Sequence, residues 1–269
     1  GELARFPASA AVYLPGGAPA QPEQFLNLGN LGATLRMLAD EGPDAFYKGA
    51  IATAMAEDLQ EGGSRITVDD LAAYNPQVLT PLAHDHRGAI LYTPSENSGG
   101  QRLSEAFDFV TEHLDPSRPF GAHAYEIYAK ALNQAFDNHE RRLGRLPETG
   151  STSHMSAVDA DGNMVALTYT LLNRFGSKVV LPSSGVLMNN AVSYFDPRPG
   201  YPTSMVGGKR INASNMCPTV CVRDDEAIFA VGASGANHIV PCTMQVAAYM
   251  LDYDMSLEEA FNTPRIDAG

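Results

Sequence analysis

Residues 150–170, GSTSHMSAVDADGNMVALTYT, decide the fold that the sequence predicts. Two runs, 153–159 and 163–171, alternate between polar and apolar residues as half-buried strands do. The segment between them contains the Asp-Gly pair of a tight hairpin turn. Three hydroxyl residues, Ser151, Thr152 and Ser153, stand at the start of the first run. The stretch therefore predicts a β-hairpin, and it raises the question of whether one of these hydroxyls is a nucleophile.

The character of the sequence differs on the two sides of this hairpin. Upstream, residues 22–140 show mostly helical patterns, with glycine stops and a capping box made by Thr67 and Asp70. Downstream, short runs rich in Val, Leu and Thr predict strands, and two helices close the chain. The predicted helices are 24–42, 49–63, 122–144, 239–254 and 256–264, and the further predicted strands are 177–182, 185–190, 219–224 and 226–234. This order predicts an α+β fold in which helices cover a sheet built largely from the second half.

Charge and hydropathy argue against nucleic acid and membranes as partners. The 269 residues contain 18 Lys and Arg against 31 Asp and Glu, which gives a formal net charge of −13. A chain this acidic lacks the basic surface that binds nucleic acid or anionic lipid. The longest nearly apolar run, 239–251, is interrupted by polar residues and is too short for a bilayer span. The first residues lack the basic and apolar blocks of a secretory signal.

Cysteine and histidine do not indicate a metal site. Cys217, Cys221 and Cys242 lie in apolar contexts without a C-x-x-C pair, so we expect small buried core residues rather than disulfides or zinc ligands. His84 and His86 form an H-x-H pair beside Gly and Pro, and a surface turn is the favoured interpretation over a metal pair. We expect no metal and no cofactor.

One candidate nucleophile is Ser234, which lies between a predicted strand and a predicted helix in a sequence close to G-x-S-x-G. In hydrolases with that motif the catalytic histidine follows the serine, and no histidine follows His238 in this chain. The same Gly-rich turn offers another chemistry, because the backbone N–H groups of Gly235 and Ala236 could face an oxyanion. This second role needs no side chain.

The other candidate nucleophile is Thr152. A threonine hydroxyl is a poor nucleophile unless a base is adjacent, and the α-amine of a threonine that begins a chain is such a base. A free α-amine titrates near pH ~8, close enough to neutrality to take the hydroxyl proton. The chemistry requires cleavage of the peptide bond before Thr152, and on the local residues alone an ordinary turn is the favoured explanation of the hydroxyls.

Longer motifs follow one another along nearly the whole chain, at 42–76, 94–110, 152–170, 174–190, 195–200 and 215–240. In this order they resemble the later part of the large subunit and the small subunit of γ-glutamyltransferases, also called γ-glutamyltranspeptidases. These are self-processing N-terminal-nucleophile hydrolases. The resemblance implies a four-layer αββα sandwich. Set against complete family members, the chain is expected to lack the first part of the large subunit and the end of the small subunit.

Roles carried over from this resemblance concentrate on the hairpin and the Gly-rich turn. Thr152 matches the nucleophile, and Ser151 precedes the self-cleavage bond. Thr170 matches the second threonine of a T-x-T motif that orients the nucleophile. Gly235 and Ala236 match the glycine pair of the oxyanion hole, where alanine is acceptable because the donor is a backbone N–H.

Other matches concern the substrate. Ser214 and Asn215 match a serine pair that helps to hold the α-carboxylate of the substrate, with one hydroxyl replaced by an amide. Tyr169, Asn189 and Asn190 also fit the family pattern, either as scaffolding or in a direct role.

Departures from the family pattern also concern the substrate. Ser193 and Tyr194 stand where transferases that act on glutathione carry two aspartates, one of which binds the α-ammonium of the glutamyl group. Leu172 stands where a polar residue usually reaches the same ammonium. The pattern resembles acylase-like and hydrolytic members of the family, some described as cephalosporin acylases.

We therefore expect a self-processing Thr-nucleophile amidohydrolase or acyltransferase that cleaves γ-glutamyl or related acyl amide bonds, with hydrolysis favoured. Residues 1–151 would form a mostly helical large-subunit part and 152–269 a small-subunit part with the central sheet, intertwined in one structural domain. Expected partners are a small-molecule or peptide amide substrate and the two subunits of one precursor, with neither nucleic acid nor membrane. The expected compartment is the bacterial cytoplasm or periplasm. The alternatives are an unprocessed or non-catalytic family fragment, or a serine hydrolase that uses Ser234.

Overall fold

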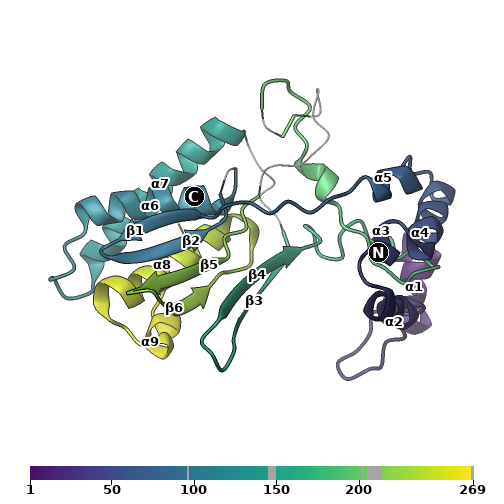
Figure 1. Cartoon of the computed structure of the whole chain (residues 1–269), viewed down its shortest axis with the longest axis horizontal. Coiled ribbons are helices and arrows are strands. Elements are labelled where there is room, and N and C mark those ends of the chain that lie inside the picture. The colour runs from purple at the N-terminus through teal and green to yellow at the C-terminus, as the bar shows by residue number, and fades with distance from the viewer. Residues whose placement is uncertain (96, 145–149, 202, 205–213, 268–269) are drawn as a thin grey trace. The chain divides into compact units, whose positions relative to one another are not determined.

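The computed structural model describes residues 1–95, 97–144, 150–201, 203–204 and 214–267 (Figure 1). The chain divides into two compact units. Unit 1 comprises residues 1–78 and 173–190, and unit 2 comprises residues 79–172 and 191–269. Neither unit follows the division at residue 151 that the sequence suggested, because each combines residues from both sides of it. That division concerns a bond to be cleaved and stays a prediction.

Unit 1 is mostly helical. Its elements are η1 (Glu2–Arg5), α1 (Pro7–Tyr13), η2 (Pro15–Gly17), α2 (Leu31–Glu41), α3 (Asp44–Tyr47), α4 (Ala50–Glu61) and α5 (Val68–Ala72). The buried residues Ala45, Ile51, Met55 and Leu181 form its core. The predicted capping box of Thr67 and Asp70 begins α5 as expected. Segment 173–190 is therefore held to the helices by an apolar contact, although it lies far from them in sequence.

The strands predicted at 177–182 and 185–190 do not form as regular strands. The two segments form one isolated bridge, between Val180 and Leu187, and are joined by a few further backbone hydrogen bonds without becoming regular strands. Instead of pairing in a sheet, the backbone is anchored by Ser9, whose buried hydroxyl donates to Lys178 O at 2.7 Å and accepts from Val180 N at 2.9 Å. The apolar runs predicted strands, but no further strand of unit 1 lies within the described residues to extend this pair.

Unit 2 contains the described sheets. Its elements are β1 (Leu82–His86), β2 (Ala89–Thr93), α6 (Gly99–His113), α7 (Ala122–Leu143), β3 (Thr152–Val158), β4 (Met164–Thr170), η3 (Ala191–Tyr194), β5 (Thr219–Arg223), β6 (Glu226–Val231), η4 (Ala236–His238), α8 (Ile239–Tyr253) and α9 (Leu257–Asn262). Four antiparallel strands pair in the order β1-β2-β5-β6, and β3 and β4 form a separate two-stranded sheet. Buried residues of β2, β5 and β6 pack with those of α6, α7 and α8 in one apolar core.

The interpretation of His84 and His86 as part of a surface turn is wrong. Both side chains are buried on β1, and the turn consists of Arg87 and Gly88, which have positive φ angles of 55° and 81°. His86 Nε2 lies 2.8 Å from a carboxylate oxygen of Asp252 in α8, and Nδ1 lies 2.8 Å from the Thr111 hydroxyl. A buried imidazole needs such partners, and they come from residues far away in the sequence. Strands β1 and β2 thus place two of the four sheet strands in the first half of the chain, whereas the sequence predicted a sheet built largely from the second half.

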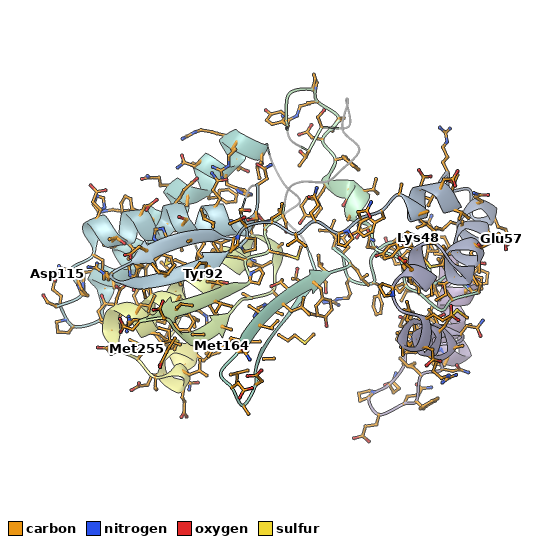
Figure 2. All side chains as sticks on the ribbon, viewed as in Figure 1. Lys48, Glu57, Tyr92, Asp115, Met164 and Met255 are labelled. Atoms are coloured by element: carbon orange, nitrogen blue, oxygen red, sulfur yellow. The ribbon has the colours of Figure 1, made fainter. Side chains whose placement is uncertain are left out.

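The predicted hairpin is confirmed as β3 and β4, in a register that places Thr152 opposite Thr170. One side of it contacts β5 and β6. The other side exposes Met155, Val165, Leu167 and Tyr169. Figure 2 shows these strands with their side chains and labels Met164 at the start of β4. The described residues of unit 2 thus form a helical layer, a four-stranded sheet and the hairpin sheet, and they do not supply helices over the exposed side of the hairpin.

None of the helices in the described part of the chain is both long enough and apolar enough to cross a membrane.

Candidate active site

The bond predicted for self-cleavage lies at the first residue of β3. Ser151 precedes the strand, and its backbone N–H donates to the carbonyl oxygen of Leu172 just beyond β4. The hydroxyl of Thr170 donates to the carbonyl oxygen of Ser151 at 2.9 Å. That carbonyl belongs to the Ser151–Thr152 peptide bond. The second threonine of the predicted pair therefore contacts the oxygen that becomes negatively charged if Thr152 attacks this bond.

Leu172 completes this arrangement with its backbone. Its N–H donates to the Thr170 hydroxyl oxygen at 2.8 Å, so that a chain of two hydrogen bonds runs from Leu172 through Thr170 to Ser151. Hydrogen bonds in such a chain polarise one another and strengthen the donor at its end. Leu172 has a φ of 74°, an uncommon conformation for a residue with a side chain, and its side chain is buried. The sequence indicated Leu172 only as a departure in substrate recognition, whereas the structure uses its main chain.

Gly235 lies in the turn between β6 and η4, and Ala236 is the first residue of η4, beside the predicted cleavage bond. Both have positive φ angles, 109° and 52°. A Cβ atom on Gly150 would be 3.4 Å from the Ala236 Cβ, so the segment before Ser151 passes directly next to this turn. The structure thus brings the candidate nucleophile, its hydroxyl partner and the candidate oxyanion donors into one part of unit 2.

Of the predicted pair Ser214 and Asn215, Asn215 contacts the residue that follows this turn. The Asn215 amide is buried and donates to the side-chain oxygen of Asn237 at 2.9 Å. Asn237 directly follows Ala236. Gly99, at the start of α6, leaves no room for a Cβ because the Asn215 carbonyl lies against it. The Ser214 hydroxyl accepts from Met216 N at 2.9 Å. Binding of a substrate carboxylate by this pair stays a prediction, and the observed bonds give Asn215 a role in holding Asn237.

A buried cation that sequence reasoning missed lies behind the same turn. Arg102 of α6 is fully buried, and its Nη1 lies 3.5 Å from the Asn237 carbonyl oxygen. Burial lowers its pKa to about 10, so it remains charged at neutral pH. Burial also lowers the pKa of His139 to about 4, which keeps that imidazole neutral. The signal in the sequence was the position of this arginine, three residues after Gly99 and four before Ala106, both of which are buried on the same face of α6.

Tyr194 and Asn190 are placed in different units. Tyr194 belongs to η3 of unit 2, where its partly buried ring packs on Leu143. Burial raises the pKa of its phenol, which therefore stays neutral. Asn190 is the last residue of unit 1, and its side-chain oxygen accepts from Asn173 N at 2.9 Å. A part for either residue in substrate binding stays a prediction.

The alternative nucleophile Ser234 is exposed in the same turn. His238 is nearby in sequence, but it forms an ion pair with Asp267. No hydrogen bond joins Ser234 to His238 within the described ranges. The described residues also contain no group of three or more His, Cys, Asp and Glu that could hold a metal ion.

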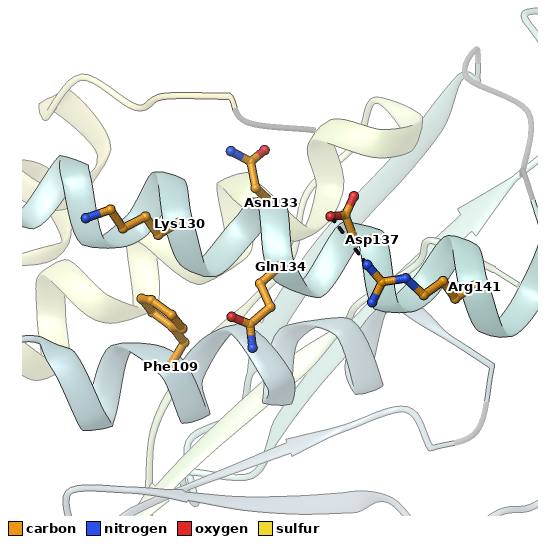
Figure 3. A pocket seen from close by; sticks show the side chains of 6 residues that line it. All are labelled: Phe109, Lys130, Asn133, Gln134, Asp137 and Arg141. Atoms are coloured by element: carbon orange, nitrogen blue, oxygen red, sulfur yellow. Dashed lines mark ion pairs between the residues drawn. The ribbon is translucent and has the colours of Figure 1, made fainter.

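A groove between α6 and α7 contains none of these residues. It is lined by Phe109, Lys130, Asn133, Gln134, Asp137 and Arg141 (Figure 3). Its two cations already have carboxylate neighbours, since Lys130 pairs with Glu126 at 2.6 Å and Arg141 lies 3.9 Å from Asp137. The groove therefore does not compete with the hairpin as a catalytic site.

Comparisons with known proteins identify the family to which the sequence is similar. The family model described as Gamma-glutamyltranspeptidase matches residues 1–146 and 126–269. The glutathione hydrolase proenzyme of Escherichia coli (strain K12) is 33% identical over 309 residues, which cover 96% of this chain and 53% of that protein. The acylase ACY 1 proenzyme of Pseudomonas sp. (strain SE83) is 31% identical over 305 residues, covering 99% of this chain and 54% of that protein.

A solved structure gives the fold. The cephalosporin acylase from Bacillus halodurans superimposes with a TM-score of 0.83 at 23% identity, over 95% of this chain and 53% of that one. The likeness confirms the predicted fold class. The chain spans about half the length of the curated relatives it matches.

Proposed function

The chain belongs to the gamma-glutamyltranspeptidase family, and on that premise we propose that it carries the nucleophile and the oxyanion donors of a self-processing amidohydrolase. The observation that supports this most directly is the hydrogen bond from Thr170 to the Ser151 carbonyl. It places a donor on the carbonyl oxygen of the bond that must break. Mass spectrometry of the purified protein is the test, because an active enzyme must consist of two polypeptides, one ending at Ser151 and one beginning at Thr152.

In the proposed maturation step, the Thr152 hydroxyl oxygen attacks the carbonyl carbon of Ser151. Negative charge develops on the Ser151 oxygen, where the Thr170 hydroxyl already donates. The C–N bond then breaks, the hydroxyl proton ends on the Thr152 nitrogen, and an ester links the two residues. Water hydrolyses this ester, which leaves a carboxylate on Ser151 and a free α-amine on Thr152.

In the proposed catalytic cycle, that α-amine acts as the base for the Thr152 hydroxyl. The hydroxyl attacks the carbonyl of an amide substrate, and the N–H groups of Gly235 and Ala236 stabilise the oxyanion. The leaving amine departs with a proton, and an acyl ester of Thr152 remains. Water then attacks this ester and releases the acid. Hydrolysis is the expected fate of the ester, in preference to transfer to an acceptor amine.

The two pieces are expected to stay associated after cleavage. Strand β2, before the cleaved bond, pairs with β5, after it, through Ile90, Leu91 and Tyr92. The apolar core likewise packs α6 and α7, which precede the cleaved bond in sequence, against α8, which follows it. Cleavage therefore interrupts the chain without dividing the sheet, as expected for two subunits from one precursor.

The expected substrate has a γ-glutamyl-like acyl group without dependence on an α-ammonium. The two relatives are named as a glutathione hydrolase and an acylase, so the alternatives are a γ-glutamyl group and another acyl group. Ser193 and Tyr194 stand where the family resemblance places aspartates, and Tyr194 is a neutral phenol here. A neutral phenol offers an ammonium group no opposite charge. Glutaryl amides are thus expected to be at least as good substrates as γ-glutamyl amides.

Tyr194→Asp is expected to shift preference toward γ-glutamyl substrates by about ten- to a hundredfold. A charge-assisted contact to a buried ammonium is worth ~1.5–3 kcal/mol, which corresponds to this range. The measurement is kcat/KM for glutaryl and γ-glutamyl amides of one leaving group, in the wild type, in Tyr194→Asp and in Tyr194→Phe as the uncharged control. A wild type that already prefers γ-glutamyl by a hundredfold would show that another residue binds the ammonium.

Ser234→Ala separates the proposed nucleophile from the serine alternative. Because Ser234 forms no hydrogen bond with His238 in the described residues, we expect the variant to cleave itself and to turn over substrate within about threefold of the wild type. The rates of both reactions are measured side by side. Loss of turnover by a hundredfold or more, with self-cleavage intact, would instead favour Ser234 as the nucleophile.

A further inference from the structure

His154 connects the strand of the candidate nucleophile to the strand of the candidate oxyanion donors. It lies two residues after Thr152 on β3, so both side chains point to the same side of the hairpin. Its Nδ1 is 2.7 Å from the Thr168 hydroxyl on β4, and its Nε2 is 3.1 Å from the Ser156 hydroxyl. Ser156 in turn donates to the carbonyl oxygen of Ala230 on β6 at 3.0 Å. The imidazole is thus the middle of a polar chain that runs from the hairpin to the four-stranded sheet.

The proton positions in this chain follow from its last member. The Ala230 carbonyl can only accept, so the Ser156 proton points toward it. The Ser156 oxygen must then accept from His154, which places a proton on Nε2. Burial lowers the pKa of His154, so the ring is neutral at pH 7 and Nδ1 accepts from Thr168. The contacts therefore select one tautomer, protonated on Nε2.

A second contact joins the same ring to the turn itself. A Cβ atom on Gly232 would overlap the ring atoms Cε1 and Nδ1 of His154. Gly232 directly follows β6, three residues before Gly235. The imidazole therefore rests directly on the backbone that leads into the turn. A larger residue at 232 or a smaller one at 154 would change the spacing between the two strands.

We propose that His154 is a positioning residue, which holds the Thr152 strand at a fixed distance from the backbone N–H groups of Gly235 and Ala236. The inference rests on the proposed function. We assign His154 no proton transfer, because its two ring nitrogens contact the hydroxyls of Thr168 and Ser156 within the protein. Its effect is geometric: an error of about 1 Å in such a site costs on the order of a hundredfold in rate.

The test compares variants that remove different parts of the contact. His154→Phe keeps a ring against Gly232 but makes no hydrogen bonds, and His154→Gln keeps a donor for Ser156. We expect His154→Phe to lower kcat and the self-cleavage rate by about ten- to a hundredfold with KM changed less than twofold, and His154→Gln to recover part of the loss. His113→Gln, at an exposed histidine of α6, is the matched control and should behave as the wild type.

A spectroscopic measurement makes the proposal independent of rates. Nitrogen-15 NMR of the imidazole should show the proton on Nε2 in the folded wild type. A proton on Nδ1, or a His154→Phe variant with wild-type kcat and self-cleavage, overturns the inference while leaving the proposed function intact. If His154→Phe does not fold, Ser156→Ala removes the link to Ala230 at an exposed position and should show the same loss of kcat at unchanged KM. A wild type that never cleaves at Ser151–Thr152 contradicts the proposed function, and the inference falls with it.

Discussion

Thr152→Ala is expected to remain a single chain and to lose almost all amide hydrolysis, whereas the wild type is cleaved into two polypeptides. The reason is that this one hydroxyl serves both proposed steps, attack on the Ser151 carbonyl and attack on the substrate. Removal of a covalent nucleophile leaves only the rate that binding and oxyanion donors provide, and losses of about 10⁴-fold or more are usual. No other single substitution in the candidate site is expected to have a larger effect.

The measurement is the intact mass of the protein at its full natural length, followed over days at neutral pH. Thr152→Ser retains the attacking hydroxyl and should therefore still cleave. Ser153→Ala is the matched control, because Ser153 is the neighbouring hydroxyl on the opposite, exposed side of β3. Cleavage of Thr152→Ala between residues 151 and 152, or a wild type that stays intact, would refute the assignment.

Thr170→Val is expected to slow self-cleavage by about 10²- to 10³-fold. Valine has nearly the shape of threonine and suits a strand, so β4 should be preserved while the donor to the Ser151 carbonyl is lost. Loss of a single donor from an oxyanion site has an effect of this size. The N–H of Leu172 also loses its acceptor, which adds to the cost.

The rate is followed by the appearance of the two pieces after the unprocessed protein is purified. Thr170→Ser keeps the hydroxyl and should remain within about tenfold of the wild type. A circular dichroism melt of each variant establishes that the hairpin is folded at the assay temperature. Cleavage of Thr170→Val within threefold of the wild type would mean that the hydrogen bond seen at Ser151 does not contribute to bond breaking.

Elements encoded by contiguous residues could be predicted from the sequence. The hairpin of β3 and β4, the helices α4 and α7, and the capping box at Thr67 depend on local alternation, helical spacing and neighbouring polar groups. The strands β1 and β2 were missed, and the two histidines of β1 look like surface residues in isolation. His86 is buried only because Asp252 supplies a partner 166 residues later in the chain.

The candidate site likewise has features that the sequence predicts and features that only the fold determines. The hydroxyls of Thr152 and Thr170 and the Gly-rich turn at 232–236 are visible as local patterns, and the family resemblance assigned their roles. Their assembly is a property of the fold. The left-handed backbone of Leu172, the bond from Thr170 to the Ser151 carbonyl and the contact of His154 with Gly232 each need two strands or a strand and a turn in register.

The sequence by itself therefore determined which residue types and local elements are present, because side-chain chemistry and short-range backbone preferences act within a few residues. Only the tertiary structure decided which carbonyl the Thr170 hydroxyl meets and why residue 232 has no side chain. The physical reason is that a hydrogen bond or a steric contact depends on positions within a few tenths of an ångström. Such positions are set by packing between segments that lie far apart in the sequence, as His154 and Gly232 do.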